Sequence, residues 1–244
     1  MKKYLYSLFL LFSIHLYAQD HVWLTAINDT GSDPRWGLTG IKFMPNNIEI
    51  QHVFPDSMDR IYFTLACASV SDSIGNLLFY TNGLTIFNAN HDTMQNAKWF
   101  NNGMYVSDSL GDKHLGVVQS VIILPHPKLS YLYYLFHSVP EIHFNATQAN
   151  SLKYSVVDMR LDSGRGAVIE KNVSILNDWI CKGYITACKH ANGKDWWLIN
   201  PKVQQGSYYR TLFTGDSIST PEKQFIGAAG PQAQQGFEIG RAHV

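Results

Sequence analysis

The chain has 244 residues, enough for one sizeable domain, and its 19 basic and 19 acidic side chains give a formal net charge of zero. Charged residues make up 16% and aromatic residues 13% of the sequence, so the chain can build a core and does not have the composition of a disordered protein. Lysine and arginine are scattered, whereas nucleic-acid-binding domains normally carry a basic face. The composition therefore argues against a nucleic-acid partner.

The N-terminus has the features of a secretory signal peptide. Lys2 and Lys3 form a short basic start, residues 4–17 are almost wholly apolar, and Ala18 supplies the small residue at which signal peptidase would cut. This apolar run is too short to span a bilayer, and no second run of about 18 apolar residues follows it. We expect residues 1–18 to direct export through the Sec machinery, and the mature chain to be extracellular or bound at the outer-membrane surface without a transmembrane segment. The alternative is that residues 1–18 form a buried strand or helix.

Short β-branched and aromatic runs, broken by Gly, Asn, Asp and Pro, dominate the rest of the chain. Three predicted hairpins can be laid over one another, and they cover residues 66–80, 121–136 and 185–199. The most marked turn signals in them are Asp72-Ser73-Ile74-Gly75-Asn76 and Asn192-Gly193. Each hairpin is followed by a further predicted strand, over residues 85–88, 152–159 and 208–213, and the second also by one over 167–175.

A repeat of four strands every 40–50 residues or so is typical of a β-propeller, in which longer loops lengthen the period. We therefore predict an all-β fold over residues 19–237: a partial β-propeller of about three four-stranded blades, preceded by an N-terminal strand or hairpin over residues 40–50. The next blade is expected to open over residues 225–236. The alternative is a β-sandwich, which explains the strands but not the repeated hairpin followed by an outer strand.

The last seven residues, 238–244, are unlike the rest of the chain. Ile239 to Val244 can be back-translated as ATC GGA AGA GCA CAC GTC, which resembles the adapter used in short-read sequencing. We therefore expect residues 238–244 to be a sequencing artefact and the propeller to be incomplete at its C-terminal side. The alternative is a genuine C-terminus with a chance match.

An ordered series of segments carries a family resemblance. The most specific segment is Gly75-Asn76-Leu77-Leu78-Phe79-Tyr80-Thr81-Asn82-Gly83. The other matching segments are residues 36–37, 40–43, 67–72, 88–94, 119–127, 133–136, 152–159, 164–166, 171–172 and 186–199. Together they resemble the N-terminal propeller-like region of large Bacteroidota surface proteins, the gliding-motility-associated or type B sorting-domain proteins exported by the type IX secretion system. The family often has Asn-Gly where this chain has Gln95-Asn96-Ala97.

The resemblance implies a secreted or cell-surface protein whose partners include the type IX secretion system. It also implies a binding, adhesion or scaffold role, with a glycan or a surface protein as the ligand. Type IX export depends on a C-terminal sorting domain that does not occur in these 244 residues, so this route follows from the resemblance alone.

The sequence lacks the short motifs of common hydrolases, metalloproteases and nucleotide-binding proteins, so we assign no catalytic, cofactor-binding or metal-binding residues. The alternative to a binding module is a glycan-active hydrolase or lyase with carboxylates at the central channel of the propeller. Because the acidic residues fall mostly in predicted turns, we favour binding.

Paired aromatic residues are the candidate ligand-binding groups. Neighbours on a strand point to opposite faces, so one ring of a pair can lie exposed as a platform for a sugar. The candidates are Trp196, Trp197, Tyr133 and Tyr134. The alternative is that both rings of each pair are buried between blades.

A calcium site is the one cofactor that the sequence leaves open. Asp29, Asp33, Asp108 and Asp112 lie in glycine-containing loops that could supply carboxylate ligands. Asp72, in contrast, is expected to cap a tight turn rather than bind calcium.

Five segments fit the pattern Asp-Ser/Thr-apolar, which resembles the O-glycosylation signal of exported Bacteroidota proteins and is also ordinary turn chemistry. The possible acceptors are Ser57, Ser73, Thr93, Ser109 and Ser217.

Three cysteines, Cys67, Cys181 and Cys188, leave at least one thiol unpaired within the chain. We expect three buried thiols; the alternative is one disulfide. Their spacing does not favour a zinc site.

Overall fold

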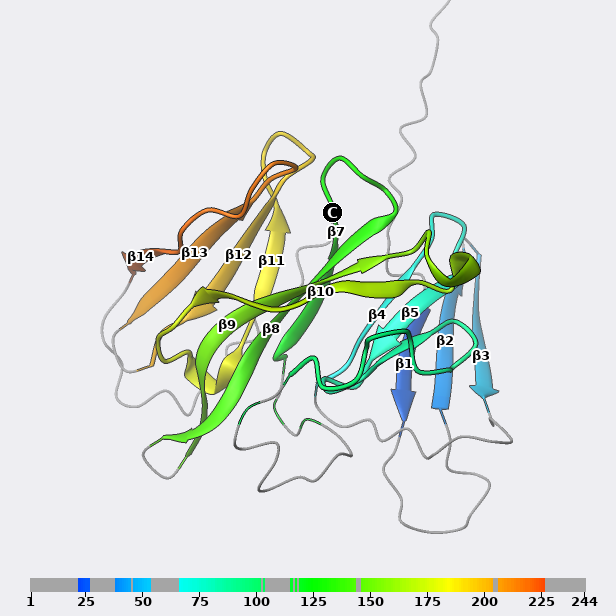
Figure 1. Ribbon diagram of the computed structural model, residues 1–244, viewed down its shortest axis with the longest axis horizontal. Coiled ribbons are helices and arrows are strands. Elements are labelled where there is room, and N and C mark those ends of the chain that lie inside the picture. Colours follow the sequence, from blue (N-terminus) through cyan, green and yellow to red (C-terminus); the bar gives the residue numbers. More distant parts are fainter. Residues whose placement is uncertain are drawn as a thin grey trace, which may run out of the picture.

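The computed structural model describes residues 22–26, 38–44, 46–53, 66–101, 103, 115, 117, 119–143, 146–203 and 206–226. The described residues form four small antiparallel sheets, together with turns and two short 3-10 helices, which confirms the all-β prediction (Figure 1). The two segments predicted to be a signal peptide and a sequencing artefact, residues 1–18 and 238–244, lie outside the described residues.

The four sheets follow one another along the chain, and each is a simple meander in which consecutive strands pair. Sheet A contains β1 (Val22–Ala26), β2 (Leu38–Met44) and β3 (Asn47–Val53). Sheet B contains β4 (Ala68–Ser71), β5 (Leu77–Thr81) and β6 (Ile86–Asn88). Sheet C contains β7 (Val121–Pro125), β8 (Leu132–His143), β9 (Ala146–Asp158) and β10 (Ala167–Leu176). Sheet D contains β11 (Thr186–Lys189), β12 (Trp196–Pro201), β13 (Ser207–Phe213) and β14 (Glu222–Phe225).

The three predicted hairpins are confirmed as β4–β5, β7–β8 and β11–β12. Side-chain caps fix two of their turns. The Asp72 carboxylate accepts hydrogen bonds from the backbone N–H groups of Ile74 (3.0 Å) and Asn76 (2.8 Å), as expected for a turn cap. The Asn192 side chain accepts from Lys194 and Asp195 in the same way, at 3.0 Å each.

Sheets C and D have the four strands predicted for a blade, whereas sheets A and B differ from the prediction. Within the described residues the N-terminal strand belongs to a three-stranded sheet, and sheet B has three strands rather than four. The segment around Phe225 does not open a new blade, because β14 pairs with β13 from Ser207↔Phe225 to Arg210↔Glu222 and completes sheet D. Its sequence, EKQF, is exposed at every position and has no apolar periodicity by which it could be recognised as a strand.

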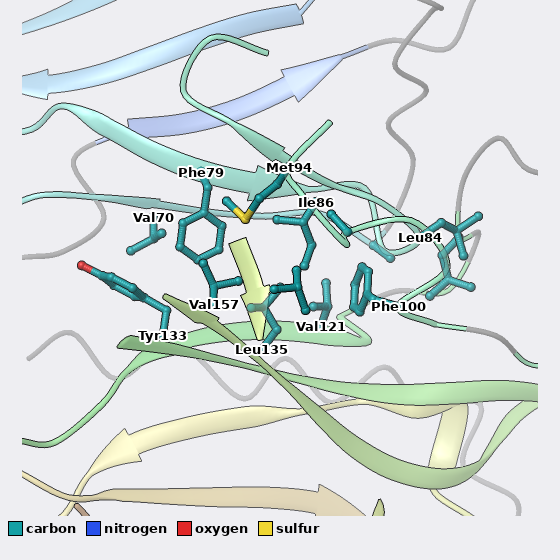
Figure 2. Close-up of a cluster of buried hydrophobic side chains, with 14 of the residues drawn as sticks. Val70, Phe79, Leu84, Ile86, Met94, Phe100, Val121, Tyr133, Leu135 and Val157 are labelled. Atoms are coloured by element: carbon teal, nitrogen blue, oxygen red, sulfur yellow. The ribbon is translucent and has the colours of Figure 1, made fainter. Parts of the chain in front are cut away.

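Neighbouring sheets pack face to face in chain order. Val22 and Leu24 of sheet A pack with Tyr80 and Phe87 of sheet B. Sheets B and C share the largest buried cluster, in which Phe79 meets Tyr133 edge to face with ring centroids 5.4 Å apart. Figure 2 shows this cluster with Leu135, Val157 and Phe100 around it.

Sheets C and D share a third cluster, in which Phe136 and Phe213 lie with ring centroids 5.3 Å apart. The core is therefore divided among three interfaces between sheets rather than gathered in one place.

The first strands of the four sheets, β1, β4, β7 and β11, lie next to one another, and we call the side of the molecule on which they lie the inner side. The Ser69 hydroxyl of β4 donates to the Val22 carbonyl of β1 at 2.8 Å, and β4 also contacts β7. The N–H of Ile185, just before β11, donates to the carbonyl of Gln119, just before β7, at 3.0 Å. The last strands of the end sheets, β3 and β14, lie at opposite sides of the molecule in Figure 1. Within the described residues the series is open, and it closes into neither a ring nor a barrel.

The cysteines differ in part from expectation. The three, all within the described residues, form no disulfide. Cys181 is buried and Cys188 is half-buried, but Cys67 is exposed, so the expectation of three buried thiols is wrong for Cys67. Ala66 beside it is fully buried, and alternation along an extended chain turns the next side chain outward.

Candidate functional site

The longest hairpin of the structure extends beyond its own sheet. Pairing of β7 with β8 reaches only Val121↔His137, and pairing of β10 with β9 reaches only Leu176↔Leu152. Residues 138–143 and 146–151 therefore form a two-stranded ribbon, which projects at the lower left of Figure 1.

A segment between β10 and β11 ties this ribbon to sheet D. Ile180 exchanges backbone hydrogen bonds with Ala149 of the ribbon, at 2.7 and 3.1 Å, and also forms a bridge with Lys202 beyond β12. The residues before Ile180 are thereby held between the ribbon and the end of β12.

A cavity of about 590 Å³ lies beside the ribbon, and we call it the hairpin cavity. Small-molecule sites measure roughly 300–1,000 Å³. Its lining combines one indole ring with carboxylate, ammonium, amide and hydroxyl groups. The lining residues are Gly103, Val139, Glu141, Asn150, Ser151, Lys153, Asn177, Asp178 and Trp179.

Trp179 is the aromatic residue of the hairpin cavity. Its half-buried ring stacks on His143 of β8, with centroids 3.9 Å apart and planes 12° from parallel. Its backbone is also held, because its carbonyl accepts from the N–H of Val203 at 3.2 Å and its N–H donates to Asp178 at 2.7 Å. The indole is therefore fixed before any ligand arrives.

Asp178 is the centre of a charged cluster. Its carboxylate accepts hydrogen bonds from the Lys202 ammonium and from the Tyr209 hydroxyl. Burial raises the pKa of Asp178, but the hydrogen bonds from Lys202, Tyr209 and the Trp179 N–H outweigh burial and hold its pKa below the ordinary value. Burial and the neighbouring Asp178 raise the pKa of Tyr209. Asp178 therefore stays ionised at neutral pH, and Lys202 balances its charge.

The amide groups of the hairpin cavity are oriented by neighbouring hydroxyls. Ser151 donates to the side-chain oxygen of Asn150, and Ser174 donates to that of Asn177, both at 2.9 Å. With the oxygen of each amide engaged, its NH₂ group is the part that can donate to a ligand. The hairpin cavity thus offers hydrogen-bond donors and acceptors around one flat apolar ring.

A second cavity, of about 430 Å³, lies between β10 and the loop after β13, and we call it the seam groove. Tyr134, Tyr154, Phe213 and His126 line its aromatic side. The ring centroid of Tyr134 lies 5.4 Å from that of Tyr154 and 4.6 Å from that of Phe213. The exposed ion pair between Lys128 and Asp216, 2.5 Å apart, joins the two sheets beside this groove.

The structure separates the four aromatic residues singled out from the sequence. Tyr133 is 7% exposed and belongs to the core between sheets B and C, whereas Tyr134 lines the seam groove. Trp196 is half-buried at the seam of sheets C and D, where its indole N–H donates to the Pro125 carbonyl at 3.2 Å. Trp197 points to the opposite face of sheet D and lies beside His190. Their part in ligand binding stays a prediction.

The remaining sequence predictions fall partly outside the described residues. Ser73, Thr93 and Ser217 are exposed, as glycosylation requires, while Ser57 and Ser109 lie outside the described residues. So do the four loop aspartates considered for calcium, namely Asp29, Asp33, Asp108 and Asp112. In the part of the chain that the structure describes, no three His, Cys, Asp or Glu side chains gather closely enough to hold a metal ion.

Sequence reasoning missed the main groups of the hairpin cavity, Trp179, Asp178, Glu141 and Lys153. They come from three segments of the chain, and only the long ribbon brings them together. The one local signal was Asn177-Asp178-Trp179, a polar and aromatic stretch between two predicted strands.

No protein-family model, curated protein or solved structure matches this chain. Nowhere in its described part does a helix have the length and apolarity needed to cross a membrane.

Proposed function

We propose that this chain is a carbohydrate-binding β-propeller module of an exported cell-surface protein. The observation that carries this proposal is the hairpin cavity, where the fixed Trp179 ring is surrounded by amide, hydroxyl and charged groups. A sugar ring has apolar C–H faces and a rim of hydroxyls, so it needs a flat apolar surface together with polar groups that fix its orientation. The residues of this cavity supply both.

The propeller part of the proposal is supported by the order of the sheets. Four consecutive meanders pack face to face with their first strands on the inner side, as blades do. A sandwich would instead consist of two packed sheets.

One face of sheet A supports the same arrangement. Ile41↔Ile50 and Phe43↔Ile48 are cross-strand pairs on the face opposite to Val22 and Leu24, and Ile48 and Ile50 are 57% and 62% exposed. A further blade packed on this face would cover these side chains.

Export and surface location are supported by the signal-like residues 1–18 and by the resemblance to type IX-secreted surface proteins. The partners proposed on this basis are the Sec machinery, the type IX secretion system and a glycan at the cell surface.

The state of Asp178 favours binding over glycan hydrolysis or elimination. The general acid of a glycosidase needs a raised pKa, whereas Lys202 and Tyr209 hold the pKa of Asp178 low and occupy its carboxylate. Asp178 is therefore unsuited to act as that general acid, and we favour binding over the hydrolase or lyase alternative.

The proposal is tested by probing a glycan array with the purified protein and with W179A. The expected result is binding to a defined set of glycans by the wild-type protein and loss of those signals in W179A. Near-UV circular dichroism is the control for folding. A folded wild-type protein that binds no glycan would contradict the proposal.

A further inference from the structure

We propose that the hairpin cavity selects saccharides that carry a carboxylate, and that Lys153 binds this carboxylate. The inference rests on the proposed function, because it names the class of sugar for the same cavity. It comes from the position of Lys153 and from the way the other charges of the cavity are already satisfied.

Lys153 is the lysine that lines the hairpin cavity. It lies on β9 directly opposite His137 of β8, and its side chain is half-buried. Within the described residues the side-chain ammonium of Lys153 has neither a hydrogen bond nor an ion pair, although its backbone pairs with both neighbouring strands. Its neighbour cannot balance its charge, since His137 is fully buried and can carry at most a second positive charge. The ammonium is therefore available to an anionic group in the cavity.

Neither carboxylate of the hairpin cavity competes for this ammonium. Asp178 is paired with Lys202 and accepts from Tyr209. Glu141 pairs with Gln148 in the ribbon. It lies four residues along β8 from His137, which pairs with Lys153. At about 3.3 Å per residue the backbone positions of Glu141 and Lys153 lie roughly 13 Å apart along the ribbon, and within the described residues Glu141 forms no ion pair with Lys153.

Hydroxyl-binding groups lie beside Lys153 on the same strand. Asn150 and Ser151 lie on β9 between Lys153 and Gln148, the residue that pairs with Glu141. Trp179 lines the same cavity. A uronic acid matches this set, because its carboxylate is attached directly to a ring that bears several hydroxyls. Lys153 would take the carboxylate, Asn150 and Ser151 the adjacent hydroxyls, and Trp179 the ring face.

The test compares two ligands that have the same sugar rings and differ in whether their carboxyl groups are free or methyl-esterified. Binding of trigalacturonic acid and of its fully methyl-esterified form is measured by isothermal titration calorimetry on the purified protein at low salt. A hydrogen bond to a charged group should make the protein bind the acid about 10- to 100-fold more tightly than the methyl ester. The preference should shrink as sodium chloride is added.

Variants then assign the preference to Lys153. K153M should lose the preference, K153R should keep it, and K194M, in the exposed turn after β11, is the matched control that should behave like the wild type. Equal binding of acid and ester, or a preference that survives in K153M, would overturn this inference and leave the proposed function standing. If the folded wild-type protein bound neither of these ligands and no glycan on the array, the proposed function would fall and the inference with it. Binding to neutral glycans alone would overturn only the inference.

Discussion

Trp179 lies flat against His143, with ring centroids 3.9 Å apart and ring planes 12° from parallel. The two residues belong to different elements, because His143 ends β8 whereas Trp179 lies in the connection between β10 and β11. Since His143 covers one face of the indole, only the other face can meet a ligand. The stack thus gives the hairpin cavity one rigid apolar wall.

Replacing Trp179 should abolish most of the affinity for a glycan. W179A removes the only ring of the hairpin cavity within the described residues, and buried aromatic anchors of binding sites contribute about 2 kcal/mol or more, or about 30-fold in Kd. W179F should retain part of the affinity because it keeps a ring. Calorimetric titration with a glycan identified on the array measures both changes.

Trp197 provides the control for that experiment. It lies on the face of sheet D that does not meet sheet C and does not line the hairpin cavity. If the glycan binds in that cavity, W197A should leave the affinity within about twofold. Loss of binding in W197A with full binding in W179A would place the glycan on sheet D instead.

Asp178 should matter for stability more than an exposed ion pair does. In D178N the Lys202 ammonium, whose side chain is 14% exposed, loses its charged partner, and the free energy of unfolding should fall by about 1–2 kcal/mol. D216N breaks the pair with Lys128, in which both side chains are more than half exposed. This change should alter the free energy of unfolding by about 0.5 kcal/mol or less. Urea titrations at neutral pH measure both values, and equal losses would contradict the prediction.

His137 should make the protein less stable in mild acid. Burial, and to a smaller extent the charge of Lys153, lower the pKa of His137 from 6.5 to about 3. Below about pH 6.5 the unfolded chain therefore binds a proton that the native state does not, so stability is complete above this pH and declines as the pH falls toward 3. Between about pH 6.5 and pH 5 the loss from this group is about 1.5 kcal/mol.

Urea titrations across this pH range test the prediction. The pKa values of His91 and His126 are also lowered by burial, so they add to the same trend. Replacing His137 by Gln should reduce the slope of stability against pH, whatever it does to stability at neutral pH. A slope unchanged in H137Q would show that the pKa of His137 is the same in the folded and the unfolded state.

The hairpins could be predicted because their signals are local. Asp72 and Asn192 cap turns within a few residues of themselves, and the flanking runs are β-branched or aromatic. In contrast, the sequence of β14 is polar and exposed and carries no strand signal of its own. This strand forms because β13 offers a free edge with which it can pair. Arg210 of β13 also forms an ion pair with Glu222 of β14 at 2.6 Å. The β-propensity of its residues cannot reveal a strand that forms only because a neighbouring strand pairs with it.

The hairpin cavity could not be predicted for a similar reason. Asp178 meets Lys202 and Tyr209 only because Ile180 bridges the β8–β9 ribbon to the end of β12. The paired aromatic residues attracted attention in the sequence, yet strand alternation sends the two members of each pair to different surroundings, so adjacency along the chain did not indicate a site.

Gly83 should tolerate no side chain. Its φ of +91° lies in the left-handed region, and a Cβ would come within 2.7 Å of the Leu115 Cβ and 3.0 Å of the Ala66 Cβ, both in the core between sheets B and C. G83A combines backbone strain with overpacking and should lower the free energy of unfolding by about 2–4 kcal/mol. Gly193 separates the two effects: its φ is +71° but no atom lies within 4 Å of a Cβ there, so G193A should show the backbone strain of about 1 kcal/mol alone. Chemical denaturation of both variants decides the matter, since equal losses would mean that the core around Leu115 yields to an extra methyl group.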